Sequence, residues 1–428
     1  MLDLKYIVQN VEEVKANLEK LGDVTAPLER ILDLDAQRRS LVKEADDLRA
    51  ERKSTSKRIG KMEDGPERQD LVEAMRGVSD RIAELEGQGR QVQEALQEAL
   101  LGMPNMPDPD VPVGKGEEEN QVVRTVGEKP SFSFDPSPHW DLGVQLGILD
   151  FERGVKLSGS RFYILVGEGA RVQRALIAWM IDLHVKEHGY IEIYPPYMVR
   201  RDCMVGTGQL PKFGENLYRD AEEDYYWIPT AEVPVTNMYR EEILEEEALP
   251  IYHTAYTACF RREKMSAGKD VRGIKRGHQF DKVEMVKFVT PETSDEELTS
   301  LLSNAEEVCK RLELPHRVVQ MCTGDLSFTA CKKFDVELWA PGCEEWLEVS
   351  SCSNFREFQS RRAGIRFRRK GGGKPEYVHT LNGSGLALPR VMIALMEHYQ
   401  NEDGGVTVPK VLRPYLNGME RIVGKGSA

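Results

Sequence analysis

Apolar side chains recur at alternating spacings of three and four residues along most of the first hundred residues. With a few polar interruptions, one series runs through Ile31, Leu34, Arg38, Leu41, Ala45, Leu48, Arg52, Thr55, Ile59 and Met62, and a second through Leu71, Met75, Val78, Ile82, Leu85, Gly89, Val92, Leu96 and Ala99. A turn-like segment, residues 63–68, separates the two series. Heptads on both sides of one turn predict an antiparallel α-helical coiled-coil hairpin over about residues 28–101. Each helix would be about 50 Å long, so we expect a projecting arm.

The pattern changes after a proline-rich segment at residues 103–112. We predict an N-terminal domain over residues 1–103, a linker over 104–130 and a C-terminal domain over 131–428. The C-terminal part mixes a long amphipathic helix with short apolar runs of strand length. The helix is predicted at residues 172–188, and the strands at 255–260, 283–289, 334–339 and 346–351. Because hairpin-length loops join several of these runs, we predict an α+β fold, with an antiparallel six- to eight-stranded sheet and flanking helices.

One stretch near the C-terminus combines glycines, polar residues and an arginine just before an apolar helix. Residues 380–390 contain Gly383 and Gly385, end at Arg390, and run into the apolar segment 391–397. Glycines allow close approach of a ligand to the backbone. Free N–H groups before a helix favour an anion, and Arg390 would add a planar donor fork. The alternative is a glycine-rich turn into a buried helix, with Arg390 as a surface cap.

The composition excludes several classes of protein. Of the 428 residues 40% are hydrophobic, and the net charge is −13. No apolar run approaches the roughly 18 residues of a membrane span, and the N-terminus lacks a secretory signal, so we expect a cytoplasmic protein. Seven cysteines without a C-x-x-C pair argue against a disulfide framework or a zinc knuckle. Any contact with nucleic acid must come from local basic patches.

Two local basic runs stand out against this acidic background. The first lies near the hairpin turn and consists of Arg49, Arg52, Lys53, Lys57, Arg58 and Lys61. On a projecting arm it suits a phosphate backbone, and the alternative is an ordinary solvated face. The second run lies within residues 361–374, where seven Arg and Lys side chains occur without an acid. It either steers an anionic polymer or forms a solvated hairpin.

Three segments occur in the order found in class II aminoacyl-tRNA synthetases. Residues 188–196 resemble motif 1, residues 259–263 with 278–284 resemble motif 2, and residues 380–390 resemble motif 3. Several further segments are similar to signatures of seryl-tRNA synthetases, namely residues 111–114 with Glu117, 139–143, 230–232, 266–273, 348–351 and 380–385. The predicted arm resembles the tRNA-binding domain of the same family. The resemblance covers essentially the whole chain and implies a class II catalytic domain over residues 131–428.

The resemblance implies an enzyme that activates L-serine with ATP and Mg²⁺ and then transfers serine to tRNA. Its catalytic residues would be Arg261 and Arg390. The serine-binding residues would be Thr230, Ala231, Glu232, Arg261, Glu284 and Ser384. The ATP-binding residues would be Arg261, Arg262, Glu263, Phe280, Glu348, Val349, Ser350, Ser351 and Arg390. Glu348 and Ser351 would supply the hard oxygen ligands that Mg²⁺ prefers.

The chemistry is consistent with these residue types. A carboxylate ionised at neutral pH needs no general base to attack the α-phosphate of ATP. Charge develops on phosphate oxygens, so fixed cations and Mg²⁺ should dominate catalysis. The alternative role of Arg261 is a salt bridge at a strand end, and that of Glu232 and Glu284 is a structural ion pair. Pro389 replaces the glycine of many bacterial relatives and suits the first turn of a helix.

The expected partners are tRNA(Ser), with tRNA(Sec) as a further candidate, and a second copy of the chain in a homodimer through motif 1. Two other hypotheses remain open. An enzyme of the same fold that loads an amino acid onto a carrier protein would lack the long arm. A non-catalytic RNA-binding or regulatory paralogue would lack the arginines of motifs 2 and 3, whereas Arg261 and Arg390 are both present.

Overall fold

The computed structural model describes residues 1–264 and 272–424, which form two compact units. The first unit comprises Met1–Val14 and Asp23–Pro104, and the second comprises Lys15–Gly22 and the chain from Asn105 onward. None of the helices in these described residues is both long enough and apolar enough to cross a membrane. Of the predicted linker, residues 104–130, all but Pro104 belong to the second unit.

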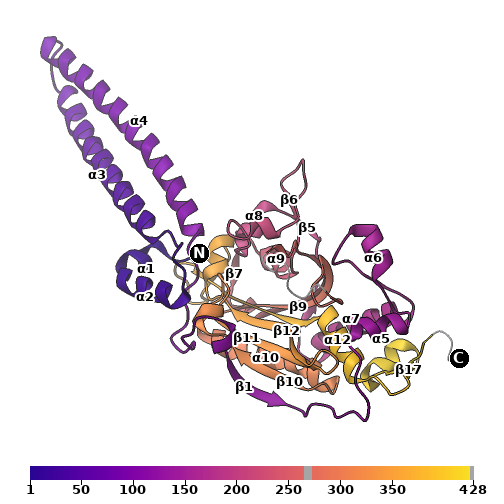
Figure 1. Ribbon diagram of the computed structural model, residues 1–428. Coiled ribbons are helices and arrows are strands. Elements are labelled where there is room, and N and C mark those ends of the chain that lie inside the picture. The colour runs from indigo at the N-terminus through magenta and orange to yellow at the C-terminus, as the bar shows by residue number, and fades with distance from the viewer. Residues whose placement is uncertain (265–271, 425–428) are drawn as a thin grey trace. The chain divides into compact units, whose positions relative to one another are not determined.

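The first unit is dominated by a hairpin of two long helices. Its helices are α1 (Leu4–Gln9), α3 (Leu28–Ile59) and α4 (Pro66–Leu101), and α2 (Val11–Leu21) contributes residues to both units. Helices α3 and α4 lie side by side along their length (Figure 1). Ile31 and Ala45 of α3 are buried, as are Ile82, Leu85 and Leu96 of α4. These are positions of the two predicted series, so the antiparallel coiled-coil prediction is confirmed.

Within the described residues, the sheets and the remaining helices belong to the second unit. The helices are α5 (His139–Gln145), α6 (Phe151–Ser158), α7 (Glu168–Glu187), α8 (Arg201–Gly206), α9 (Glu232–Asn237), α10 (Ser294–Arg311), α11 (Phe358–Ala363) and α12 (Leu388–His398). The strands of the main sheet are β1 (Gln121–Val126), β4 (Ile191–Glu192), β8 (Ile251–Phe260), β9 (Gln279–Val289), β10 (His316–Gln320), β11 (Lys332–Ala340), β12 (Glu345–Asn354) and β15 (His379–Ala387). Shorter strands are β2 (Leu149–Asp150), β3 (Ile164–Leu165), β5 (Met198–Arg200), β6 (Tyr225–Trp227), β7 (Ile243–Glu245), β13 (Arg366–Arg368), β14 (Glu376–Tyr377), β16 (Val406–Thr407) and β17 (Arg421–Ile422).

The main sheet, within the described residues, has eight strands in the order β1-β10-β11-β12-β15-β9-β8-β4. All neighbouring pairs are antiparallel except β4 and β8 at one edge, which are parallel. The predicted α+β fold with an antiparallel sheet is confirmed, with this one parallel pair as an addition. Helices α7, α10 and α12 pack against the sheet and share one apolar core with it (Figure 1).

The glycine-bearing stretch before Arg390 is a strand, so the alternative of a glycine-rich turn there is wrong. Residues His379–Ala387 form β15, between β12 and β9. A Cβ on Gly383 would lie 2.9 Å from Cys352 Sγ, and one on Gly385 would lie 2.3 Å from His184 Nε2. Both glycines therefore make room for buried neighbours of the sheet. The helix predicted at 391–397 is confirmed as α12.

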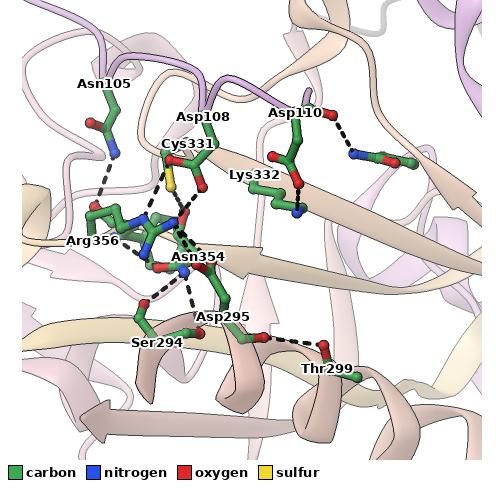
Figure 2. A network of polar contacts seen from close by, with 12 residues as sticks. Asn105, Asp108, Asp110, Ser294, Asp295, Thr299, Cys331, Lys332, Asn354 and Arg356 are labelled. Carbon is green, nitrogen blue, oxygen red and sulfur yellow. Dashed lines mark hydrogen bonds and ion pairs between the residues drawn. The ribbon is translucent and has the colours of Figure 1, made fainter. Parts of the chain in front are cut away.

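Residues after Pro104 are built into the second unit by a polar network, as Figure 2 shows. Asn105 Nδ2 donates hydrogen bonds to the carbonyl oxygens of Thr329 and Phe355, at 2.9 and 3.0 Å. Arg356 bridges Asp108 and Asp295, each at 2.8 Å. Further along, β1 pairs with β10 at the sheet edge. The segment is thus fixed to the residues just before β11, to those just after β12, and to β10.

Candidate active site

A cavity of about 580 Å³ opens on the sheet, and its lining includes side chains of β9, β12 and β15. This volume lies in the range of small-molecule sites. Among the predicted site residues, those that line the cavity are Thr230, Glu232, Arg261, Glu263, Phe280, Glu284, Glu348, Val349, Ser351, Ser384 and Arg390. Of the predicted serine- and ATP-binding residues, all of them described, Ala231, Arg262 and Ser350 lie outside the lining. Ala231 and Ser350 are buried behind it, and Arg262 is exposed.

One end of the cavity is a buried hydrogen-bond network around Glu284. The side chain of Glu284 is 1% exposed. Its Oε2 accepts a hydrogen bond from Thr230 Oγ1 at 3.0 Å and forms an ion pair with Lys282. Its Oε1 accepts one from Asn382 Nδ2 at 3.1 Å. A buried carboxylate needs such partners, so this network holds the charge in a fixed geometry. We call it the carboxylate end of the cavity.

Glu232 lies at the same end, at the start of α9. Gln359 Nε2 donates to Glu232 Oε1 at 2.6 Å, and Thr380 Oγ1 donates to Gln359 Oε1 at 2.7 Å. Burial, together with the nearby charge of Glu284, raises the pKa of Glu232 to about 7. Gln359, Lys282 and Arg261 act in the opposite direction but do not cancel the effect. Glu232 is therefore a carboxyl group that a positively charged ligand can ionise.

The other end of the cavity carries two arginines and is more open to solvent. Arg390 sits in the first turn of α12, and its Nη1 donates to the carbonyl oxygen of Glu348 at 2.6 Å. The Arg261 guanidinium lies 5.0 Å from the ring centroid of Phe280. Arg276 and Glu263 lie 3.8 Å apart nearby. This arrangement of cations and one aromatic ring suits an anionic, planar ligand. We call it the arginine end.

A bulge in β12 brings Glu348 and Ser351 to the same face of the sheet. In a regular strand, residues three apart point to opposite faces. Here the pairing with β11 shifts by one, from Ser350 opposite Val336 to Glu348 opposite Glu337. Val349 is the extra residue, as in a β-bulge. As a result, Glu348 and Ser351 both line the cavity.

The oxygen atoms of Glu348 and Ser351 fit a hard cation. Removal of water around Glu348 disfavours its charge, but Arg390, Lys333 and Arg261 outweigh this and hold its pKa below the ordinary value. The carboxylate is thus ionised at neutral pH, with a hydroxyl close by on the same strand face. A carboxylate and a hydroxyl, completed by ligand and water oxygens, form the kind of set that Mg²⁺ takes.

Three polar residues of the carboxylate end were missed in the sequence, namely Lys282, Gln359 and Asn382. Lys282 and Asn382 could have been found from the two-residue period of a strand, in which alternate side chains point to the same face. Phe280, Lys282 and Glu284 alternate along β9, and Asn382 precedes Ser384 by two residues on β15. All five line the cavity. Gln359 had no local signal, because it reaches the site from α11.

The two basic runs differ in how far acids neutralise them. On α3, Arg49 pairs with Asp46 and with Glu86 of α4, and Arg58 lies 3.5 Å from Glu67. Arg52 reaches Ser79, at 3.4 Å, and the three lysines of this run are exposed, namely Lys53, Lys57 and Lys61.

In the second run, Arg369 is held by three glutamates from elsewhere in the unit, namely Glu246, Glu292 and Glu376. The guanidinium of Arg362 donates to the carbonyl oxygens of Val205 and Leu210. Part of this run is therefore structural. Of the predicted signature at 266–273, residues 266–271 lie outside the described residues.

Comparison with known proteins agrees with this geometry. A family model described as the tRNA synthetase class II core domain (G, H, P, S and T) matches residues 214–399, and the seryl-tRNA synthetase N-terminal domain matches residues 1–107. The cavity-bearing unit thus has the core of a class II aminoacyl-tRNA synthetase.

The relatives narrow this class. The serine–tRNA ligase of Thermomicrobium roseum is 61% identical over 422 residues, covering 99% of this chain and 95% of that protein. The structure of seryl-tRNA synthetase from Pyrococcus horikoshii complexed with ATP is 40% identical, with a TM-score of 0.95, covering 99% of this chain and 100% of that one. The serine–tRNA ligase of Naegleria fowleri in complex with AMP is 31% identical, with a TM-score of 0.88, covering 100% and 99%. The chain belongs to the seryl-tRNA synthetase family.

Proposed function

We propose that this chain activates L-serine with ATP and then transfers it to the 3′-terminal ribose of tRNA(Ser). The observation that carries the proposal is one cavity with two chemically distinct ends. The carboxylate end, with Glu232 and Glu284, suits an ammonium and a hydroxyl. The arginine end, with Arg261 and Arg390, suits a triphosphate. A ligand that spans both ends brings an amino-acid carboxylate to the α-phosphate of ATP.

In the first step, an oxygen of the serine carboxylate attacks the α-phosphorus. The new O–P bond forms as the bond from the α-phosphorus to the bridging oxygen breaks, and pyrophosphate leaves with that electron pair. Arg261 belongs to the arginine end, and its charge also acts on Glu232 at the carboxylate end. It would therefore hold the carboxylate and the α-phosphate together and stabilise the negative charge that develops. Arg390 would bind the leaving phosphates, and Phe280 would stack on the adenine. Glu263 would contact the adenine edge.

The residues present fit a Mg²⁺ ion at the arginine end. Glu348 and Ser351 would hold it, because the β12 bulge places an ionised carboxylate and a hydroxyl on one face. When bound, the ion would neutralise charge on the phosphate oxygens. The protein's own part is to fix these two oxygens and to keep Arg390 beside them, with its Nη1 3.4 Å from Glu348 Oε2.

Serine is selected at the carboxylate end. Its ammonium would lie against Glu232, and its hydroxyl would bond to Glu284 beside Thr230 and Ser384. Alanine and glycine would leave these buried polar groups without a partner, which is the larger penalty in such a site. Threonine would add a methyl group to a cavity end already filled by hydrogen-bonded side chains.

The transfer step needs tRNA, and the hairpin of α3 and α4 is the part proposed to bind it. The exposed lysines near its turn would contact phosphates, which is recognition by shape and charge. The proposal also includes a homodimer through the motif 1 region at residues 188–196 and a cytoplasmic location. It divides the chain into domains at residues 1–103 and 131–428, with a linker at 104–130. Charging of tRNA(Sec) is a further part of it.

Serine-dependent exchange between ATP and labelled pyrophosphate tests the activation step. We expect exchange with serine and little with alanine, glycine or threonine, and absence of serine-dependent exchange would refute the proposal. Charging of total tRNA with labelled serine tests the transfer. Deletion of residues 30–98 should leave exchange nearly intact and abolish charging, since the cavity lies wholly in the second unit.

A further inference from the structure

A buried carboxylate outside the cavity ties together three separate parts of the second unit. Glu397, near the end of α12, is fully buried. Its Oε1 accepts hydrogen bonds from the backbone N–H and Nδ1 of His139, both at 2.9 Å, and from Cys343 Sγ at 3.0 Å. Its Oε2 accepts from the N–H groups of Gly342 and Cys343, at 2.9 and 3.0 Å. This buried cluster of hydrogen bonds around Glu397, which we call the knot, joins α12, the start of α5 and the turn between β11 and β12.

The imidazole of His139 continues the knot toward the cavity. Because Nδ1 donates to Glu397, the other ring nitrogen, Nε2, is an acceptor, and it accepts the backbone N–H of Ile274 at 3.2 Å. The residue before Ile274 is fitted to the ring as well. A Cβ on Gly273 would lie 2.1 Å from His139 Nε2, so a side chain there collides with the imidazole. Gly273 also has a φ of +77°, which favours glycine.

The two residues after His139 hold the same short segment from its other side. The guanidinium of Arg272 lies 4.9 Å from the ring centroid of Trp140, and it is 3.7 Å from Asp141. Lys275 Nζ then donates to Glu345 Oε2 at 2.6 Å, at the start of β12. Residues 272–276, which we call the return segment, are thus held at four consecutive positions.

The return segment leads directly into the arginine end. Lys275, Arg276 and Gly277 line the cavity, and β9 begins at Gln279 with Phe280 next. The other side of the knot lies on α12, where Glu397 is seven residues from Arg390. That spacing is about two helical turns, or roughly 10 Å. One buried hydrogen-bond chain therefore connects the return segment with the helix that carries Arg390.

We propose that His139 is a positioning residue for the arginine end: through its bonds to Ile274 and Glu397 it fixes the return segment relative to α12, and with it the nucleotide-binding face. The role rests on the proposed function, because the ligand of that end is taken to be ATP. His139 does not touch the ligand. It acts by holding Arg276, Phe280 and Arg390 in one arrangement, since small displacements of such groups cost much of their effect.

The side chains of His139, Cys343 and Glu397 could alternatively act as metal ligands. Their donor atoms all lie within 4.8 Å of one another. Two features favour the hydrogen-bonded knot. Nε2 of His139 is occupied by the Ile274 N–H, and both oxygens of Glu397 accept from backbone N–H groups. Burial, and then the charge of Glu397, raise the pKa of the Cys343 thiol, which keeps its proton for the bond to Glu397.

The test compares three variants of the intact chain. His139→Asn keeps a donor near Nδ1 for Glu397 and removes the acceptor for Ile274. His139→Gln is longer and returns an acceptor near the Nε2 position. His316→Asn is the matched control, since His316 is buried, its Nε2 lies 3.4 Å from the buried Glu306, and it does not line the cavity.

We expect His139→Asn to raise the KM for ATP in serine-dependent exchange about tenfold, with the KM for serine within about twofold. His139→Gln should recover most of this loss. His316→Asn should lower the melting temperature about as much as His139→Asn does, without a selective rise of the KM for ATP. Amide hydrogen exchange should speed up in the peptide covering residues 272–280 for His139→Asn and not for the control.

Equal rises of the two KM values, an ATP effect no larger than that of the control, or unchanged amide exchange would overturn the role. So would stoichiometric zinc in the purified protein that is lost in His139→Asn. If His139→Asn does not fold, Arg272→Gln provides the test. The Arg272 side chain is 71% exposed, so its replacement should not prevent folding. The variant should raise the KM for ATP about threefold, because the contact with Trp140 is lost. Absence of serine-dependent exchange in the unaltered chain would refute the proposed function instead. The amide exchange comparison would still test whether His139 holds the return segment in place.

Discussion

The two ends of the cavity are built on different physical principles. At the carboxylate end, Glu232 and Glu284 are buried and each accepts a hydrogen bond from a neighbouring side chain. At the arginine end, Arg390 and Glu348 are 19% and 45% exposed, line the cavity and lie 3.4 Å apart. The first end is held in place by its own hydrogen bonds before any ligand arrives. The second end leaves its charged side chains partly accessible to a ligand that is itself charged.

This difference assigns selectivity and rate to different residues. A rigid, buried end discriminates between small molecules, because a wrong ligand offers no hydrogen-bond partner to its buried polar atoms. An end with available cations stabilises charge that develops during reaction and tolerates a more solvated ligand. Substitutions at the two ends should therefore change different kinetic constants. The four predictions below test that separation, beginning with the largest expected effect.

Arg390→Gln should lower kcat for serine-dependent exchange by about 10²- to 10³-fold, because a fixed cation is lost where phosphate charge develops. The KM for serine should stay within about threefold, since Arg390 belongs to the arginine end. Steady-state exchange kinetics at saturating ATP measure both constants. Arg413→Gln is the control, as Arg413 pairs with Glu420 away from the cavity. A serine KM that rises as much as kcat falls would contradict the separation.

Glu284→Gln should raise the KM for serine by about 10- to 100-fold, because Thr230, Lys282 and Asn382 lose a shared charged acceptor. The KM for ATP should change little. Glu306→Gln replaces another buried carboxylate, which pairs with Arg124 and His316 instead of lining the cavity. A comparable effect on serine in that control would show that the loss reflects general destabilisation.

The KM for serine should fall about tenfold between pH 6 and pH 8, since the pKa of Glu232 is raised to about 7. Below that pH the carboxyl is protonated and a poor partner for the serine ammonium, and above it the carboxylate is present. Glu232→Gln should remove the dependence. The variant should also gain thermal stability relative to the unaltered chain as pH rises from about 4.5 through 7, because the raised pKa stabilises the folded state only while the proton stays bound. A pH-independent KM in the unaltered chain would contradict the assignment.

Ser350→Ala should raise the KM for serine about two- to fivefold and leave the KM for ATP unchanged. Ser350 was predicted among the ATP-binding residues, yet its Oγ donates to the carbonyl oxygen of Ser384 at 2.7 Å, toward the carboxylate end. Ser351→Ala, one residue along, provides the contrast and should affect the arginine end. If both variants changed the same constant, the two ends would not be separable along β12.

Periodic features and motif spacing carried most of the fold prediction. The hairpin follows from heptads over about residues 28–101, and α7, α12 and strands β8, β9, β11 and β12 follow from apolar patterns. Residues such as Arg261 and Arg390 stood out because motif order fixed their positions. The domain boundaries and the roles of individual site residues stay predictions.

What the sequence could not show depends on partners far away in the chain. β15 looked like a glycine turn, because the neighbours that require Gly383 and Gly385 are His184 and Cys352. The basic run at 361–374 looked uncompensated, because the acids that hold Arg369 come from distant segments. In each case the local pattern was real, but a long-range contact determined its role.

The bulge in β12 shows that the cavity requires certain side chains to point to one face of the strand. It does not require a fixed number of residues between them. Val349 is passed over in the pairing with β11, so Glu348 and Ser351 lie as two neighbours on one face would. A relative that lacks a residue at this point could carry its carboxylate and its hydroxyl two positions apart on a regular strand and keep the same geometry. Homologous sites in this fold are therefore aligned more reliably by strand pairing than by spacing along the chain.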